Sequence, residues 1–258
     1  MAMELLIVLV LSALVAFVFS NLGLGGGIMF VPILLTFTPH DEPQVMAVSL
    51  FFAMFTNIPA ALNHHKAGKV NVRVGVLVGS CAVVGAVFGA MFTMSVPGEV
   101  VRLMLACVLM VMGTKILHDT HKGKQVVEDT ASCSLSAGRV AVVGVVSVGT
   151  GFLSGSLGIG GGVITVLLLI CALGLGTRSA MGTSAFAIPI MTAVGFLTYA
   201  YGGTVIRLDL LALAPLILIS GYIGSRWGLD NLKTDTVRGV LVMAIYLAAA
   251  KMLHGVFM

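Results

Sequence analysis

Long apolar runs separated by short polar turns follow one another along most of the chain. They cover residues 3–20, 25–38, 44–63, 72–94 and 97–117 and, after a polar gap, 138–156, 160–175, 178–201, 208–227 and 237–253. Many approach twenty residues, the length that an α-helix needs to cross a bilayer. The strands of a membrane barrel would instead alternate apolar and polar side chains over about ten residues. The pattern predicts an all-α integral membrane protein with about ten transmembrane segments.

The only long polar segment falls between the fifth and sixth runs, from His118 to Ser136. It is the natural connection between two halves of a single membrane domain that covers residues 1–258. We therefore expect repeat one at 1–118, a cytoplasmic linker at 119–137 and repeat two at 138–258.

An internal repeat appears when 135 is added to the residue numbers of the first half. The block LGLGGG at 22–27 then lies on LGIGGG at 157–162. The same shift, without a gap, pairs Met46 with Met181, Ser49 with Ser184, Gly68 with Gly203 and Gly89 with Gly224. Chance matches are common between apolar sequences, but a six-residue glycine block and a serine in one register are difficult to obtain that way.

The distribution of basic residues predicts the orientation in the membrane. If all ten runs cross, eleven Lys and Arg residues lie on one side and three on the other. Cytoplasmic loops carry the excess of positive charge, so both termini are expected outside. The loops themselves support this, because Lys66, Lys69 and Arg73 occupy one loop and its equivalent in the second half retains only Arg207.

Five crossings in each half would place the second half upside down relative to the first. The fold predicted is therefore two inverted five-helix repeats, an architecture of many secondary transporters. A competing model makes runs 25–38 and 160–175 re-entrant, which leaves eight crossings and a charge ratio of nine to five. Both runs are short, and half-helices are compatible with either model.

Composition excludes several classes of protein. Hydrophobic residues make up 59% of the chain and charged residues 9%, and the mean hydropathy is +1.12. This composition is far from that of soluble globular proteins. The pI near 9.0 does not indicate a nucleic-acid partner, because the basic residues lie between apolar runs and form no stripe. The four cysteines show no CxxC spacing, and no HExxH or GxSxG motif occurs. We expect no enzyme activity, catalytic residue, metal or cofactor.

The glycine blocks carry the functional hypothesis. At each block one helix should end and another begin, and glycine leaves the backbone N–H groups uncovered. A helix N-terminus with several unpaired N–H groups and about half a positive charge can hold an anion without a basic side chain. Two such breaks in inverted halves would meet near the pseudo-twofold axis, where transporters bind substrate. The alternative is that these glycines only allow close helix packing.

Polar side chains in the third and eighth runs extend the predicted site, because an unpaired hydroxyl or amide at membrane depth is costly. Hydroxyls that bond to carbonyls of their own helix are the alternative explanation. The predicted substrate-binding residues are Asn21, Gly23, Gly25, Gly26, Gly27, Ser49, Asn57, Gly158, Gly160, Gly161, Gly162, Thr183 and Ser184. His64 and His65 are interpreted as interfacial residues at a helix end, with proton handling or anion attraction as the alternative.

The glycine motifs also carry a resemblance to a known family. The sequence GLGGGIMFVPILL at 23–35, its echo GIGGGVITVLLLI at 158–170 and the two five-helix halves resemble the TauE/SafE family of sulfite exporters over essentially the whole chain. The resemblance implies a permease of the prokaryotic inner membrane for sulfite, sulfonates or related sulfur-containing anions. One departure is that Val31-Pro32 follows the first block but Val166-Leu167 follows the second.

The function expected is therefore secondary transport of a small inorganic or organic sulfur anion by alternating access at the paired glycine breaks. An anion channel would use the same architecture, and a membrane-embedded scaffold or enzyme is the remaining alternative. The lipid bilayer is the expected environment. A coupling ion, H⁺ or Na⁺, and a homodimer both stay open.

Overall fold

All the regular structure described is helical. The computed structural model describes residues 2–38, 41–121, 137–206 and 208–231. Its helices are α1 (Ala2–Leu22), α2 (Gly27–Phe37), α3 (Glu42–Lys66), α4 (Val72–Ser95), α5 (Gly98–His121), α6 (Ala137–Leu157), α7 (Gly162–Leu173), α8 (Thr177–Tyr201), α9 (Leu208–Leu211) and α10 (Ala214–Asn231). The all-α prediction is confirmed for these segments. The run expected at 237–253 and nearly all of the linker lie outside the described residues.

The helices fall into two classes of length. In the described part of the chain, α1, α3, α4, α6, α8 and the segment 208–228 are long and apolar enough to cross a membrane. The apolar helices α2 and α7 have only 11 and 12 residues, about 17–18 Å at a rise of about 1.5 Å per residue. They are too short to cross a hydrocarbon core of about 30 Å by themselves. The chain is a multi-pass membrane protein with two half-length helices.

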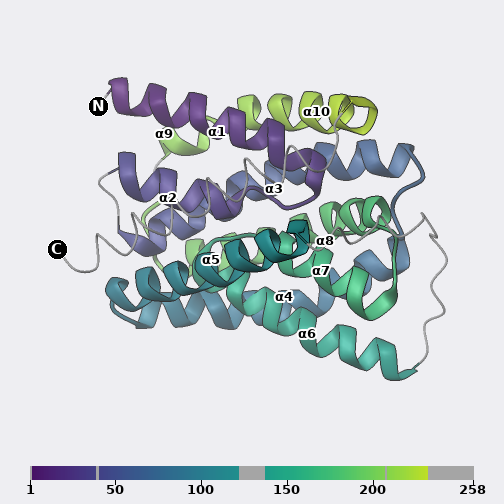
Figure 1. Ribbon diagram of the computed structural model, residues 1–258. Helices are drawn as coiled ribbons and strands as arrows, with labels where there is room; N and C mark the ends of the chain where they lie inside the picture. Colours follow the sequence, from purple (N-terminus) through teal and green to yellow (C-terminus); the bar gives the residue numbers. More distant parts are fainter. Residues whose placement is uncertain (1, 39–40, 122–136, 207, 232–258) are drawn as a thin grey trace.

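The helices form three layers (Figure 1). In one outer layer α1 packs beside α10, in the other α4 packs beside α6, and α3 and α8 pack together between them. The shift of 135 residues relates these elements, since α1 and α6, like α3 and α8, begin and end at equivalent positions. The same shift relates α4 to the segment of α9 and α10. The two outer layers are therefore built from equivalent pairs of helices.

One element differs between the halves. The run expected as a single helix at 208–227 is divided into α9 and α10, with a turn at residues 212 and 213, whereas α4 is continuous. Pro215 follows this turn at the start of α10. Proline has no N–H to donate to a carbonyl of the preceding turn, and its ring crowds that carbonyl. The equivalent residue in α4 is Ser80, which imposes neither restriction.

Glycines allow the outer helices to approach closely. A Cβ added at Gly151 of α6 would overlap the backbone carbonyl of Ala82 in α4, and one at Gly85 of α4 would overlap that of Val148. Gly224 of α10 meets the carbonyl of Phe17 in α1 in the same way. Close backbone contact at small residues is characteristic of membrane helices, which gain no hydrophobic energy by leaving lipid. The contact explains part of the high glycine content.

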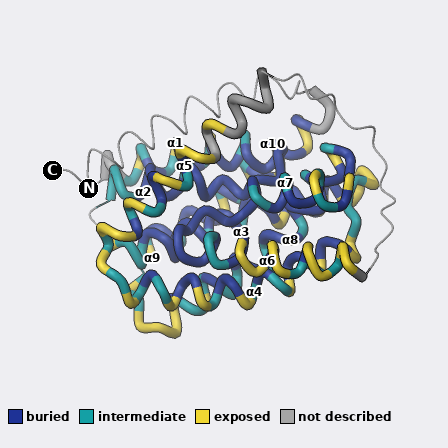
Figure 2. Tube along the Cα trace, turned by 60° about the horizontal axis from the view of Figure 1, so that its bottom comes forward, coloured by how far each residue is buried: buried dark blue, intermediate teal, exposed yellow. Residues whose placement is uncertain are grey.

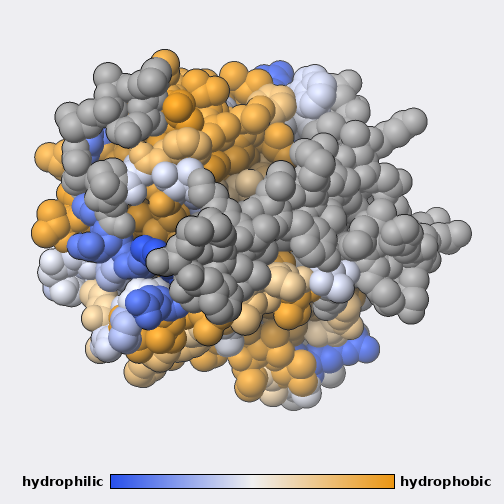
Figure 3. Space-filling view, turned by 60° about the vertical axis from the view of Figure 1, so that its left-hand side comes forward, coloured by the Kyte–Doolittle hydropathy of each residue, from blue (hydrophilic) through white to orange (hydrophobic). Residues whose placement is uncertain are grey.

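The distribution of buried residues agrees with a lipid environment. Buried residues line the middle layer, whereas exposed residues gather along the outward sides of helices such as α4 and α6 (Figure 2). Many of these exposed side chains are large and apolar, including Val145 at 74% and Phe88 at 62% exposure. Hydrophobic residues cover much of the face shown in Figure 3, with hydrophilic residues in small groups. Such a surface suits acyl chains rather than water.

Candidate substrate site at the paired helix breaks

The two breaks have the same backbone conformation. The φ angles of Gly23, Gly25 and Gly26 are +61°, +82° and +73°, and those of Gly158, Gly160 and Gly161 are +66°, +77° and +66°. Only glycine adopts such angles without steric cost. The chain therefore leaves α1 and α6 through a non-helical stretch, and α2 and α7 begin at Gly27 and Gly162.

The breaks contact each other across the two halves. A Cβ added at Gly27 would overlap the carbonyl of Ile159, and one added at Gly162 would overlap the carbonyl of Leu24. Leu24 and Ile159 are themselves equivalent under the shift of 135 residues. The contact is thus reciprocal, and the starts of α2 and α7 lie together inside the protein.

Six N–H groups at the two breaks are without acceptors. Among the hydrogen bonds formed by the described residues, none has the N–H of Gly25, Gly26, Gly27, Gly160, Gly161 or Gly162 as its donor. Their carbonyls do take part, since Gly26 accepts from the N–H of Met29 and Phe30 at 2.9 and 3.0 Å. Buried N–H groups that lack a partner are rare in folded proteins. Six of them around one contact form a set of donors suited to an anion.

Each of the two predicted serines forms a hydrogen bond with the glycine break of the other half. Ser49 Oγ donates to the carbonyl of Gly158 at 2.7 Å, and Ser184 Oγ donates to the carbonyl of Gly23 at 2.8 Å. Both serines are fully buried. Because these bonds use the hydroxyl protons, the serines position the breaks in this conformation and do not point donors at a ligand.

Asn57 lies against the first break. A Cβ added at Gly25 would lie 3.2 Å from Asn57 Nδ2, which donates to the carbonyl of Ala53 at 2.8 Å. Its Oδ1 is buried without a partner. The equivalent residue is Thr192, which lies against Gly160 and was not in the predicted set. The shift of 135 residues, applied to Asn57, would have identified it.

Two predicted residues lie away from the contact between the breaks. Asn21 packs against Gly228 of α10, where an added Cβ would overlap the amide group. Thr183 Oγ1 accepts a hydrogen bond of 3.0 Å from the N–H of Asn71, at the turn between α3 and α4. These side chains support the ends of neighbouring helices in this conformation.

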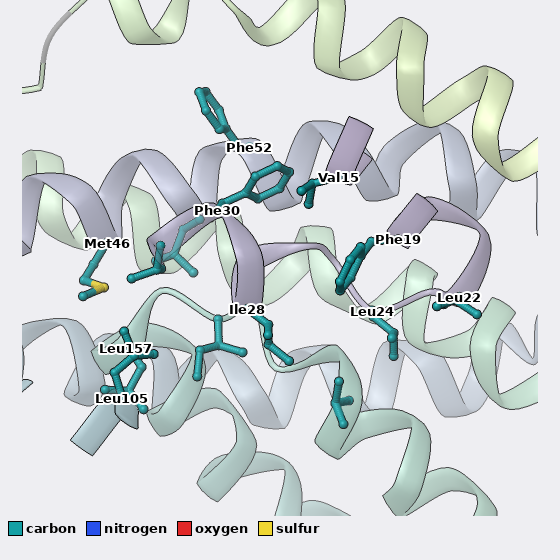
Figure 4. Close-up of a cluster of buried hydrophobic side chains, with 14 of the residues drawn as sticks. Val15, Phe19, Leu22, Leu24, Ile28, Phe30, Met46, Phe52, Leu105 and Leu157 are labelled. Atoms are coloured by element: carbon teal, nitrogen blue, oxygen red, sulfur yellow. The ribbon is translucent and has the colours of Figure 1, made fainter. Parts of the chain in front are cut away.

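Apart from these hydroxyl and amide groups, the surroundings of the breaks are largely apolar, and they carry no fixed charge. Phe30 packs edge-on against Phe52 with ring centroids 5.5 Å apart and lies beside Val15, whereas Met46 and Leu157 gather on another side (Figure 4). None of the buried residues in the described part is Asp, Glu, Lys or Arg. A low-dielectric environment strengthens the interaction of backbone dipoles with a bound charge.

Comparison with known proteins identifies the family. The model of the sulfite exporter family TauE/SafE matches residues 8–252. The chain belongs to the TauE/SafE family. It is 28% identical to the probable membrane transporter protein YdhB of Bacillus subtilis, over 95% of this chain and 97% of that protein. The probable membrane transporter protein YunE of the same organism is also 28% identical, over 95% of each chain. No solved structure matches significantly.

Membership of the TauE/SafE family defines the class of function. The family and these relatives are named as membrane transporters. The chain is accordingly a membrane transporter and not an enzyme. Within the described residues no group of three or more His, Cys, Asp or Glu side chains is arranged to hold a metal ion.

Proposed function

We propose that the chain carries a small sulfur-containing anion, such as sulfite or an organosulfonate, across the prokaryotic inner membrane by alternating access. The anion binds at the paired breaks in a conformation in which the contact between the starts of α2 and α7 has opened, and the backbone N–H groups of both breaks receive it. Asn57 contributes its amide, and Ser49 and Ser184 hold the breaks in place. The family name motivates the choice of a sulfur anion.

The observation that carries the proposal is the reciprocal contact of the two breaks. Gly27 meets the backbone of Ile159, and Gly162 meets that of Leu24. A purely structural role would not require acceptor-free N–H groups on both sides of such a contact. An inverted arrangement of the halves gives the reason for the reciprocity, because a pseudo-twofold axis in the membrane plane would pass between the breaks.

A pocket at one end of the bundle fits the role of an outer entrance. It has a volume of about 310 Å³ and is lined by residues that include Asp41, Gln44, Met94 and Thr204. In the orientation with both termini outside, this end faces away from the cytoplasm. Gln44 precedes Met46 by two residues, and Met46 contacts the second break at Gly158. The first two turns of α3 thus contribute residues both to the pocket and to the surroundings of the second break.

The test is counterflow in proteoliposomes with labelled sulfite, sulfate, thiosulfate and methanesulfonate. The Gly26→Ala plus Gly161→Ala double variant forces a side chain into positive φ and to within 2.9 Å of Phe30 and Thr150. We expect saturable counterflow of at least one anion in the native protein. In the variant the counterflow rate should fall at least about tenfold, which corresponds to about 1.4 kcal/mol in the activation free energy.

The matched control is Gly68→Ala plus Gly174→Ala. These glycines also have positive φ, +70° and +65°, but an added Cβ at either meets nothing within 4 Å. The control therefore imposes similar backbone strain away from the breaks, and it should keep its counterflow. Equal losses in both double variants would show that the breaks have no special part in transport, and absence of flux for every anion would exclude the proposed substrates.

A further inference from the structure

His64 is buried, contrary to the interfacial position predicted for it. Its side chain near the end of α3 is 2% exposed, whereas the neighbouring His65 is exposed. Neither ring nitrogen of His64 has a hydrogen-bond partner. A buried polar group without a partner is costly. A position at the membrane interface therefore does not explain why this residue is a histidine.

The ring faces the end of α1, next to the first glycine break. It lies close to the backbone of Ser20 and Asn21 without reaching hydrogen-bond alignment. On the side of α8, a Cβ added at Gly182 would lie 3.1 Å from His64 Cβ. On the side of α10, the adjacent Asn63 donates to Ser225 Oγ at 2.8 Å.

Most of the charged groups near His64 in the chain are cationic. Arg178 of α8 is the charged side chain that acts on the ring. The other basic groups nearby in the chain are His65 and Lys66 on α3 and Lys69 in the following turn, and α10 contributes Arg226, which is exposed. The last two turns of α1 contain no ionisable residue. α10 also carries the carboxylate of Asp230, four residues after Arg226.

A different residue occupies the equivalent position in the second half. The residue equivalent to His64 is Tyr199, which is fully buried and donates its hydroxyl to the carbonyl of Gly155 at 2.7 Å. Gly155 is equivalent to Ser20, the residue that His64 faces. A tyrosine hydroxyl donates at neutral pH without a change of charge, whereas a histidine ring can bind a second proton and become a cation. One half therefore has a fixed bond where the other has a titratable group.

We propose that His64 carries the coupling proton and that proton and anion cross together. The idea rests on the proposed function. A protonated ring would donate to the carbonyl of Ser20 or Asn21, as Tyr199 donates to Gly155. A buried cation needs a countercharge, and in this proposal the anion bound at the first glycine break supplies it. The proton binds to the ring nitrogen on one side of the membrane and leaves it for water on the other.

The test separates coupling from transport. Proteoliposomes with an acidic exterior are given labelled methanesulfonate, a monovalent anion that stays charged, and labelled sulfite in parallel. If one proton is carried with each monovalent anion, a gradient of one pH unit can sustain an anion concentration inside the vesicles up to about tenfold higher than outside. We expect such accumulation for the native protein and for His65→Gln, and none for His64→Gln. Counterflow, which needs no net proton movement, should persist in His64→Gln, with a lower apparent affinity because the anion loses its charge partner.

A second variant, His64→Tyr, copies the residue of the other half. It should keep counterflow and also lose accumulation, because its hydroxyl forms the fixed bond seen at Tyr199. Accumulation by His64→Gln equal to that of the native protein would overturn the proposal. So would loss of counterflow in both His64 variants, which would indicate a structural role. Native protein that exchanges anions without responding to the pH gradient would exclude proton coupling while leaving the transport function intact, and native protein without counterflow would exclude that function itself.

Discussion

At the scale of single residues, the hydroxyl groups of Ser49 and Ser184 hold the two breaks together. Replacing either serine by alanine removes the donor from a buried carbonyl, which should cost about 1–3 kcal/mol of unfolding free energy. Unfolding of the purified protein in detergent measures the loss. Ser95→Ala is the control, because Ser95 donates to the carbonyl of Met91 in its own helix and is exposed. Similar stability of all three variants would contradict a fastening role for the pair.

The same scale shows which parts of the site the sequence could predict. The glycine breaks and the equivalence of Ser49 with Ser184 follow from a shift that is visible in the sequence. The partner of each hydroxyl was not predictable, because a serine in a helix bonds equally well to its own turn. Burial of His64 was also missed. Its position four residues before Gly68 suggests a helix end near water, but the end of α1 covers it.

At the scale of elements, the contact of α4 with α6 depends on a glycine face. A Cβ added at Gly151 would overlap the carbonyl of Ala82, so Gly151→Ala should separate the helices and cost about 1–3 kcal/mol. Gly149 on the same helix is exposed, and an added Cβ there meets nothing within 4 Å. Gly149→Ala should leave stability unchanged or raise it slightly, since alanine favours the helix. Thermal unfolding of the two variants in one detergent compares them, and equal midpoints would contradict the packing role.

The helices themselves were largely predictable, because continuous apolar runs need internally satisfied backbones in lipid. Two features were not fixed by hydropathy. The apolar runs at 25–38 and 160–175 were already short, but the residues at which α2 and α7 begin are set by glycines in left-handed conformation, which hydropathy does not register. The division between α9 and α10 depends on Pro215, which has no counterpart in α4. In both cases backbone geometry, not side-chain polarity, sets the boundary.

At the scale of the whole molecule, the ends of α3 and α8 test the proposed inversion. Lys66 and Tyr201 are the last residues of these helices, are equivalent under the shift, and are both exposed, Tyr201 by 88%. If the halves are inverted, they lie on opposite sides of the membrane. In a protein whose native cysteines are replaced by serine, a membrane-impermeant maleimide applied to intact cells should label Tyr201→Cys and not Lys66→Cys.

Permeabilised cells supply the control, since both variants should then react. The result also decides between ten crossings and eight. If α2 and α7 were re-entrant, each half would cross four times, the halves would be parallel, and equivalent residues would share a side. Equal labelling of the two variants in intact cells would support that model. It would also remove the pseudo-twofold axis from the membrane plane, and the reciprocal contact of Gly27 and Gly162 would then need a different explanation from alternating access between inverted halves.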